Sequence, residues 1–283
     1  MITRERVFLE LRDAASAPEA AQTLEREGFA VLRGAFAAKD LAALASEIER
    51  VYETVAADVR NPGFTSPERE DFRYEMLNRS AACQRAVADR RILDVLEPLL
   101  GEDCHVIANT AWRNPPRPSH GHAGGNWHID AGPHIPRPPG VPWDDRIPYP
   151  IFAVAVHLLL RDCDLESGPT AVIPGSHRSG LAPPFERMQD TSLTWEGVGA
   201  LSLPGRAGDV LFFVSDVWHR RMPTGPGDRG RFFLQIHYGR RDLAQRLRPT
   251  SQVSQLSPEA IARASEPRER SVIGLHAPGF YDG

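Results

Sequence analysis

The sequence contains only three cysteines, Cys83, Cys104 and Cys163, and no two of them form a Cys-x-x-Cys pair. An odd number of widely spaced cysteines excludes a disulfide scaffold and a cysteine-based zinc site, and it favours a reducing compartment. Lysine is rarer still, because Lys39 is the only lysine among 33 basic residues. We interpret the excess of arginine as a compositional bias, which leaves any single arginine available as an anion ligand.

Long apolar runs are also missing. The longest run, residues 151–160, is interrupted by His157 and is far too short to span a bilayer. Charged residues appear from Arg4 onward, where a secretory signal would have an apolar core, so we expect a cytoplasmic protein without a membrane anchor. The net charge of −4 argues against a nucleic-acid partner. We therefore expect a small-molecule substrate, and the oligomeric state stays open.

Helical patterns dominate the first hundred residues. Apolar residues recur at spacings of three and four, with Asp40 as an expected N-cap of one helix and Pro98 and Gly101 as the expected stop of another. The expected helices cover residues 18–28, 40–59 and 82–97, with a short strand at 29–33. We expect residues 1–104 to form a largely helical layer that packs against a larger unit.

The pattern changes to short strands separated by glycine and proline from residue 105 onward. The expected strands are 105–112, 126–131, 151–160, 170–174, 198–203, 209–215 and 231–238. So many short strands predict a sandwich or barrel over residues 105–240, within a single domain that spans the whole chain. Residues 241–283 form a polar extension with one expected helix after Ser257. The irregular stretch 113–149 is either the lid of an active site or a solvated connection.

His128 and Asp130 are two residues apart in an expected strand, so their side chains should project from the same face. A third ligand could come from residues 209–219, where Asp216 or another polar neighbour could orient a ligand histidine. Two histidines and a carboxylate leave three positions of an octahedral ion open, which suits Fe(II) that binds O₂ and a co-substrate. A zinc hydrolase more often carries the motif HExxH, which is absent.

Arg231 begins an apolar strand twelve residues after His219. A guanidinium group can bind a distal carboxylate with two hydrogen bonds inside a dry barrel. The alternative is an arginine at the rim of the barrel, and Arg229 could fill either position.

These residues belong to longer motifs that together resemble one family. The motifs are Trp127-His128-x-Asp130, Glu166-Ser-Gly-Pro-Thr-Ala-Val-Ile-Pro-Gly-Ser-His177 and Gly208-Asp-Val-Leu-Phe-Phe…Trp218-His219…Arg231. The sequence resembles the phytanoyl-CoA dioxygenase-like branch of the Fe(II)- and 2-oxoglutarate-dependent oxygenases over roughly residues 20–240. The resemblance implies a mainly β fold with flanking helices, in which a double-stranded β-helix, or jelly roll, is buttressed by the N-terminal helices.

The resemblance also implies roles for individual residues. His128, Asp130 and His219 would bind the iron, and Arg231 would hold the far carboxylate of 2-oxoglutarate. Thr170 matches a position where a hydroxyl assists the arginine, and its alternative is ordinary β-strand propensity. Asn126 matches a position where an amide contacts the co-substrate, although many relatives carry the longer glutamine there.

The implied reaction is oxidation of an unactivated C–H bond of a small organic metabolite, with 2-oxoglutarate and O₂ giving succinate and CO₂. The same fold could instead catalyse desaturation, cyclisation or epimerisation, whereas Asp130 argues against halogenation because a halide needs its coordination position. Two further alternatives are a catalytically silent jelly roll that binds a metabolite and a zinc- or manganese-dependent cupin-like isomerase. An acyl-CoA substrate would need a basic patch, and Arg113, Arg117 and Arg137 could supply one.

The remaining histidines have simpler interpretations. His120 and His122 are rival ligands in a glycine-rich segment that is too flexible for a rigid site. We expect His177 to fix a turn by hydrogen bonding. His157 and His237 could face the barrel interior, but we interpret both as hydrogen-bonded core residues.

Overall fold

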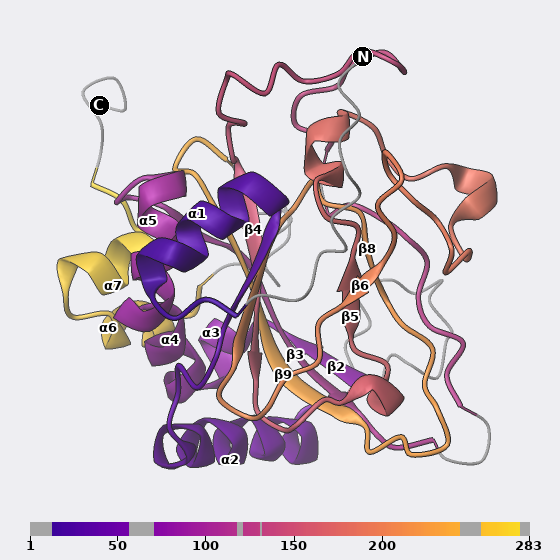
Figure 1. Ribbon diagram of the computed structural model, residues 1–283. Coiled ribbons are helices and arrows are strands. Elements are labelled where there is room, and N and C mark those ends of the chain that lie inside the picture. Colours follow the sequence, from indigo (N-terminus) through magenta and orange to yellow (C-terminus); the bar gives the residue numbers. More distant parts are fainter. Residues whose placement is uncertain (1–12, 57–70, 118–120, 131, 244–255, 278–283) are drawn as a thin grey trace.

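The computed structural model of the chain describes residues 13–56, 71–117, 121–130, 132–243 and 256–277. Two β-sheets face each other and form its centre (Figure 1). The large sheet has the strand order β1-β7-β4-β9-β3-β2, and each neighbouring pair is antiparallel. Its strands are β1 (Phe29–Leu32), β2 (Phe72–Tyr74), β3 (His105–Asn114), β4 (Ala153–Leu159), β7 (Val210–Val214) and β9 (Arg231–Gly239).

The small sheet has the order β6-β5-β8 and is also antiparallel. Its strands are β5 (Thr170–Val172), β6 (Leu201–Ser202) and β8 (His219–Arg221). On its outer side Trp127, Ala171, Ile173 and Trp218 form a separate apolar cluster. The small sheet is therefore buried on both faces, which fixes the direction in which each of its side chains points.

Helices cover the face of the large sheet that is turned away from the small sheet (Figure 1). They are α1 (Ala17–Glu27), α2 (Ala38–Thr54), α3 (Met76–Arg79), α4 (Ala81–Val87), α5 (Arg90–Leu100), α6 (Pro258–Arg263) and α7 (Pro267–Val272). Leu24, Leu44, Ile48 and Leu96 lie in one buried cluster with the outer side chains of the sheet. Amphipathic helices of this kind gain most of their stability from such a shared core.

Strand alternation divides the large sheet into a helix-side face and an inner face. On β4, Val154 and Val156 belong to the helix-side core, whereas Ala155 and Leu159 belong to the cluster between the sheets. On β9 the even-numbered residues from Phe232 to Tyr238 pack toward the helices. The odd-numbered residues Arg231 to His237 therefore face the space between the two sheets, where polar side chains would be costly without a function.

The architecture confirms the predicted jelly roll with flanking helices. The first helix and the strand after it lie where the sequence predicted them. The single helix predicted at 82–97 is wrong, because α4 ends at Val87 and Asp89 caps a new helix, α5, which runs past Pro98 to Leu100. Asp40 lies in the first turn of α2, whose N-cap is Ala37.

The strand predicted at 126–131 is reduced to one bridge between His128 and His219, and Ala131 lies outside the described residues. The expected helix after Ser257 is α6, whose N-terminus Ser257 caps. It packs through a hydrogen bond from Gln84 Nε2 to the carbonyl of Ala260, so this segment adds to the helical layer. None of the described helices is both long and apolar enough to cross a membrane.

Candidate metal centre and its cavity

His128, Asp130 and His219 converge on one point between the sheets. The Asp130 Oδ1 atom lies 3.9 Å from His128 Nε2 and 3.5 Å from His219 Nε2. All three ligand atoms lie within 4.8 Å of one another, which is close enough for a single metal ion to bridge them. The structure thus brings together the three residues that the sequence motifs selected.

Backbone hydrogen bonds hold His128 and Asp130 in position, although their segment does not form a regular strand. His128 and His219 exchange two backbone hydrogen bonds of 3.0 Å each, so the two histidines are direct neighbours on adjacent chain segments. The backbone N–H of Asp130 donates to the carbonyl of Ser215 at 3.0 Å. The segment with His128 and Asp130 is therefore hydrogen-bonded at two points to the segment that carries His219.

The two imidazoles present the same nitrogen to the metal position. His128 Nδ1 donates to the carbonyl of Asn126 at 2.8 Å, and His219 Nδ1 donates to the carbonyl of Val217 at 2.9 Å. With Nδ1 as the donor, each Nε2 carries a lone pair that faces Asp130. Asp216 does not orient either ring, contrary to the suggestion made from sequence, because backbone carbonyls already do so.

Electrostatics favour the ligand forms of these groups. Burial and the neighbouring His219 lower the pKa of His128 to about 4, although part of its side chain reaches the surface. Burial alone would raise the pKa of Asp130, but His219 and His237 hold it well below its ordinary value. Asp130 in turn raises the pKa of His219 despite the burial of that ring. A divalent cation would bind the carboxylate of Asp130 and the Nε2 lone pairs of both rings.

An inner cavity of about 210 Å³ is lined in part by His128 and His219, two of the three candidate ligands. Its lining consists of Trp112, Asn114, His122, Gly125, His128, His157, Thr170, Phe213, His219, Arg220, Arg221, Arg231, Phe233 and Gln235. These described lining residues include three arginines and no aspartate or glutamate. The cavity therefore suits an anionic ligand that also reaches the metal position.

Arg231 lies inside this cavity at the start of β9, opposite Asn114 on β3. Its Nε donates to Asn114 Oδ1 at 3.0 Å and its NH1 donates to the carbonyl of Gly168 at 3.3 Å. Among the described residues no carboxylate forms an ion pair with it. Burial, together with the charge of Arg221, lowers the pKa of Arg231 to about 9, so the group stays cationic at neutral pH and is deprived of a counter-ion.

Arg229, the sequence's alternative to Arg231, points elsewhere. Its side chain is 76% exposed and lies 3.9 Å from Asp164. The residue between the two arginines is Gly230, whose φ is +76° and where an added Cβ would collide with the carbonyl oxygen of Asn114. Of Arg229 and Arg231, only Arg231 lines the inner cavity.

Thr170 and Asn126 occupy different environments. Thr170 is buried, lines the cavity and lies opposite Arg221 in the small sheet, with Oγ1 3.4 Å from His157 Nδ1. Asn126 is exposed and does not belong to the cavity lining. The contact of its side chain with the co-substrate stays a prediction, and the contact that the structure shows is made by its carbonyl to His128.

Of the two rival ligands and the turn histidine, His122 and His177 lie among the described residues. His122 lines the cavity but accepts a hydrogen bond from the backbone of Gly124, and it is not part of the metal-binding cluster. His177 Nε2 donates to the carbonyl of Glu25, which ties its turn to α1. His120 lies outside the described residues.

Two histidines interpreted as core residues belong to the site. His157 lines the cavity and His237 Nδ1 lies 3.6 Å from Asp130 Oδ2. Trp112, Phe233 and Gln235 were not selected from the sequence either. Their alternation along β3 and β9 was the available signal, because residues two apart on a strand share the inner face.

The loop between β3 and β4 contacts the rest of the molecule through Tyr149 and His134. Tyr149 donates a hydrogen bond to Asp216 Oδ2 at 3.1 Å, and its ring contacts Trp143 and His177. His134 Nδ1 lies 2.6 Å from Asp216 Oδ1. Asp216 therefore anchors this loop beside the metal ligands.

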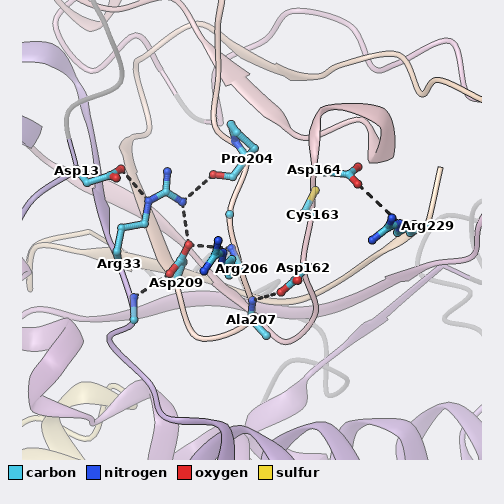
Figure 2. A pocket seen from close by; sticks show the side chains of 12 residues that line it. Asp13, Arg33, Asp162, Cys163, Asp164, Pro204, Arg206, Ala207, Asp209 and Arg229 are labelled. Carbon is cyan, nitrogen blue, oxygen red and sulfur yellow. Dashed lines mark hydrogen bonds and ion pairs between the residues drawn. The ribbon is translucent and has the colours of Figure 1, made fainter. Parts of the chain in front are cut away.

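A larger hollow of about 680 Å³ lies at the outer surface (Figure 2). Its charged groups neutralise one another: Arg33 donates to Asp13 at 2.7 Å and to Asp209 at 2.8 Å. Asp209 also accepts from the backbone of Arg206, which fixes the turn before β7. This hollow is a polar crevice held together by ion pairs, and the inner cavity remains the better candidate for chemistry.

Comparison with known proteins identifies the family. The sequence model of the phytanoyl-CoA dioxygenase (PhyH) family matches residues 24–228, which is well over half of the chain. The chain belongs to the phytanoyl-CoA dioxygenase family. This confirms the predicted enzyme class, an oxygenase that uses iron, 2-oxoglutarate and O₂.

Two kinds of relatives support the assignment. The ectoine dioxygenase of Bordetella bronchiseptica is 27% identical over 248 residues, which cover 78% of this chain and 75% of the relative. The fold matches that of EctD from S. alaskensis, solved with 2-oxoglutarate and 5-hydroxyectoine, with a TM-score of 0.61 and 22% identity over 81% of this chain and 80% of that one. It also matches the 2-oxoglutarate-dependent epimerase SnoN from nogalamycin biosynthesis, with a TM-score of 0.61 and 18% identity over 86% of this chain and 88% of that one.

Proposed function

We propose that this family member binds Fe(II) through His128 Nε2, Asp130 Oδ1 and His219 Nε2 and hydroxylates a C–H bond of a small organic metabolite. The observation that carries the proposal is the convergence of these atoms beside a cavity that also contains the buried cation Arg231. When bound, iron supplies the activation of O₂ and the oxidative decarboxylation of 2-oxoglutarate to succinate and CO₂. The residues of the chain hold, orient and shield the reactants.

The ligand set fits Fe(II) on chemical grounds. His128, Asp130 and His219 would hold Fe(II) through two neutral imidazoles and one carboxylate, a ligand set that suits an iron that must also bind a 2-oxo acid and O₂. Both Nδ1–H groups are held by backbone carbonyls, so the rings cannot turn their lone pairs away. Asp130 stays ionised at neutral pH because His219 lowers its pKa.

We propose that Arg231 binds the distal carboxylate of 2-oxoglutarate. Asn114 and Gly168 accept one hydrogen bond each and keep the guanidinium plane fixed, which leaves one N–H of NH1 and both of NH2 for the ligand. The carboxylate would give this buried cation the counter-ion that the described residues do not supply. Thr170 lines the same cavity, together with the aromatic side chains of Trp112, Phe213 and Phe233.

The relatives support a small metabolite as the substrate. The Bordetella relative is named for ectoine, and the structures of EctD and SnoN were solved with small organic molecules. The cysteines Cys83, Cys104 and Cys163 are free and buried, which supports a reducing, cytoplasmic location.

The proposal is tested by succinate formation. Purified, iron-loaded protein is incubated with 2-oxoglutarate, O₂ and panels of small metabolites, and succinate and product masses are measured. Hydroxylation adds one oxygen atom, desaturation or cyclisation removes two hydrogens, and epimerisation leaves the mass unchanged. Turnover without O₂ would contradict the oxygenase proposal and favour a metal-dependent isomerase.

A further inference from the structure

His157 is a buried imidazole in the wall of the inner cavity. It lies in the middle of β4 on the inner face, opposite Gln235 of β9. Its ring contacts Phe233, with centroids 4.4 Å apart, and meets the ring of Phe213 edge-on at 5.0 Å. The surrounding rings hold the imidazole in one orientation, so its two nitrogens have fixed surroundings.

The two ring nitrogens of His157 differ in their partners. Nδ1 lies 3.4 Å from the hydroxyl of Thr170. Nε2 is buried and has no hydrogen-bond partner among the residues that the structure describes. A buried polar atom without a partner destabilises the folded protein, so its retention beside a ligand cavity points to a ligand that completes it.

The chemistry of that ligand follows from the proton count. A neutral imidazole carries one N–H, and a hydroxyl that donates to Nδ1 leaves that proton on Nε2. Burial and the nearby Arg231 hold the pKa of His157 well below its ordinary value, so the ring is neutral. His157 therefore offers a single N–H donor, which suits an oxygen acceptor such as a carboxylate.

His157 and Arg231 share a contact with the ring of Phe233. The Arg231 guanidinium carbon lies 5.2 Å from the centroid of the Phe233 ring that His157 also contacts. Both groups line the cavity and contact the same aromatic side chain. After its bonds to Asn114 and Gly168, Arg231 keeps one N–H on NH1 and two on NH2. The two oxygens of a carboxylate offer about four acceptor positions, so a further donor can bind beside the guanidinium.

We propose that His157 Nε2–H is the second donor to the distal carboxylate of 2-oxoglutarate, beside Arg231, and that Thr170 acts as a positioning residue by fixing the tautomer of His157. The inference rests on the proposed function and adds one binding residue to it. It also gives Thr170 an indirect role, through His157, in place of a direct contact with the carboxylate.

The test compares two ligands on three proteins. Under anaerobic conditions, Fe(II)-loaded wild type, His157→Phe and His157→Gln are titrated with 2-oxoglutarate and with 2-oxopentanoate, which lacks the distal carboxylate. The weak visible charge-transfer band of the iron–2-oxo acid complex reports binding. His157→Phe should weaken 2-oxoglutarate binding about 10- to 100-fold, the range for a hydrogen bond to a charged group, and leave 2-oxopentanoate binding unchanged.

The conservative variant separates the hydrogen bond from packing. Because the amide nitrogen of glutamine reaches roughly the position of Nε2, His157→Gln should recover part of the lost affinity, and it carries the test if His157→Phe does not fold. His105→Phe is the matched control, since His105 is buried at the far end of β3 and bonds to His276 and Leu243. It should bind 2-oxoglutarate like the wild type.

Three results would overturn the inference. These are unchanged 2-oxoglutarate affinity in His157→Phe, equal losses for both ligands, and a glutamine variant as weak as the phenylalanine variant. A wild type that gives no band with 2-oxoglutarate would contradict the proposed function itself. The two failures are therefore distinguishable.

Discussion

Replacement of Arg231 should separate co-substrate binding from iron binding. The guanidinium is buried, is anchored by Asn114 Oδ1 and the carbonyl of Gly168, and has no carboxylate partner among the described residues. Truncation of one partner of a buried, hydrogen-bonded charge pair costs about 2–5 kcal/mol, or roughly 30- to 5000-fold in affinity. Arg231→Met should therefore weaken 2-oxoglutarate binding within this range and leave the iron stoichiometry unchanged.

Arg231→Lys should give a smaller loss. The ammonium keeps the charge but cannot bond to both anchors and the ligand in one plane. With each lost anchoring bond worth about 0.5–1.5 kcal/mol, we expect a roughly 10- to 100-fold loss. Anaerobic titrations give the dissociation constants, and the KM for 2-oxoglutarate in succinate assays should rise in the same order.

Arg229→Met is the matched control, because this arginine is two residues away and largely exposed. It should change 2-oxoglutarate binding little. A larger loss in Arg229→Met than in Arg231→Met would refute the assignment of the carboxylate to the inner cavity. A parallel loss of iron and 2-oxoglutarate in Arg231→Met would indicate misfolding instead.

Two further predictions concern stability. Burial lowers the pKa of His177 from 6.5 to about 4. Between these two pH values the unfolded chain therefore binds more protons than the folded chain. The free energy of unfolding should fall by about 3 kcal/mol as the pH decreases through this window. Urea titrations at pH 7 and pH 4.5 should show a smaller difference in His177→Gln than in the wild type, and an equal difference would contradict the pKa. Gly208→Ala should cost more than about 2 kcal/mol, because φ is +95° and the added Cβ would lie 2.2 Å from the carbonyl oxygen of Phe36. Gly34→Ala has open space at a φ of +57° and should cost only about 1–2 kcal/mol, so equal losses would refute the steric reason.

Local sequence patterns were enough to predict those elements in which tertiary packing favours the same structure. The first helix has one apolar side, a capping serine and a terminal glycine, and tertiary packing changes none of these. The break between α4 and α5 could not be predicted from periodicity, because Ala88 continues the pattern while Asp89 bonds to the backbone of Arg91 and begins a new helix. Capping competes with continuation at such positions, and the global packing decides.

The same limit applies to the candidate site. The spacing of His128 and Asp130 predicted a shared direction, and this holds although the strand is only a bridge to His219. The inner position of His157 could not be read from sequence, because β4 is buried on both faces and shows no alternation of apolar and polar residues. The register against β9 places His157 beside Gln235, and that register is a tertiary property.

The most direct test of the central claim is anaerobic titration of the purified chain with Fe(II), followed by 2-oxoglutarate. The wild type should bind one iron per chain and then develop the visible band of the iron–2-oxoglutarate complex. Asp130→Ala should lose both signals, whereas His122→Ala, which removes the rival histidine of the cavity lining, should keep both. Retention of the band in Asp130→Ala, or its loss only in His122→Ala, would contradict the proposed metal centre.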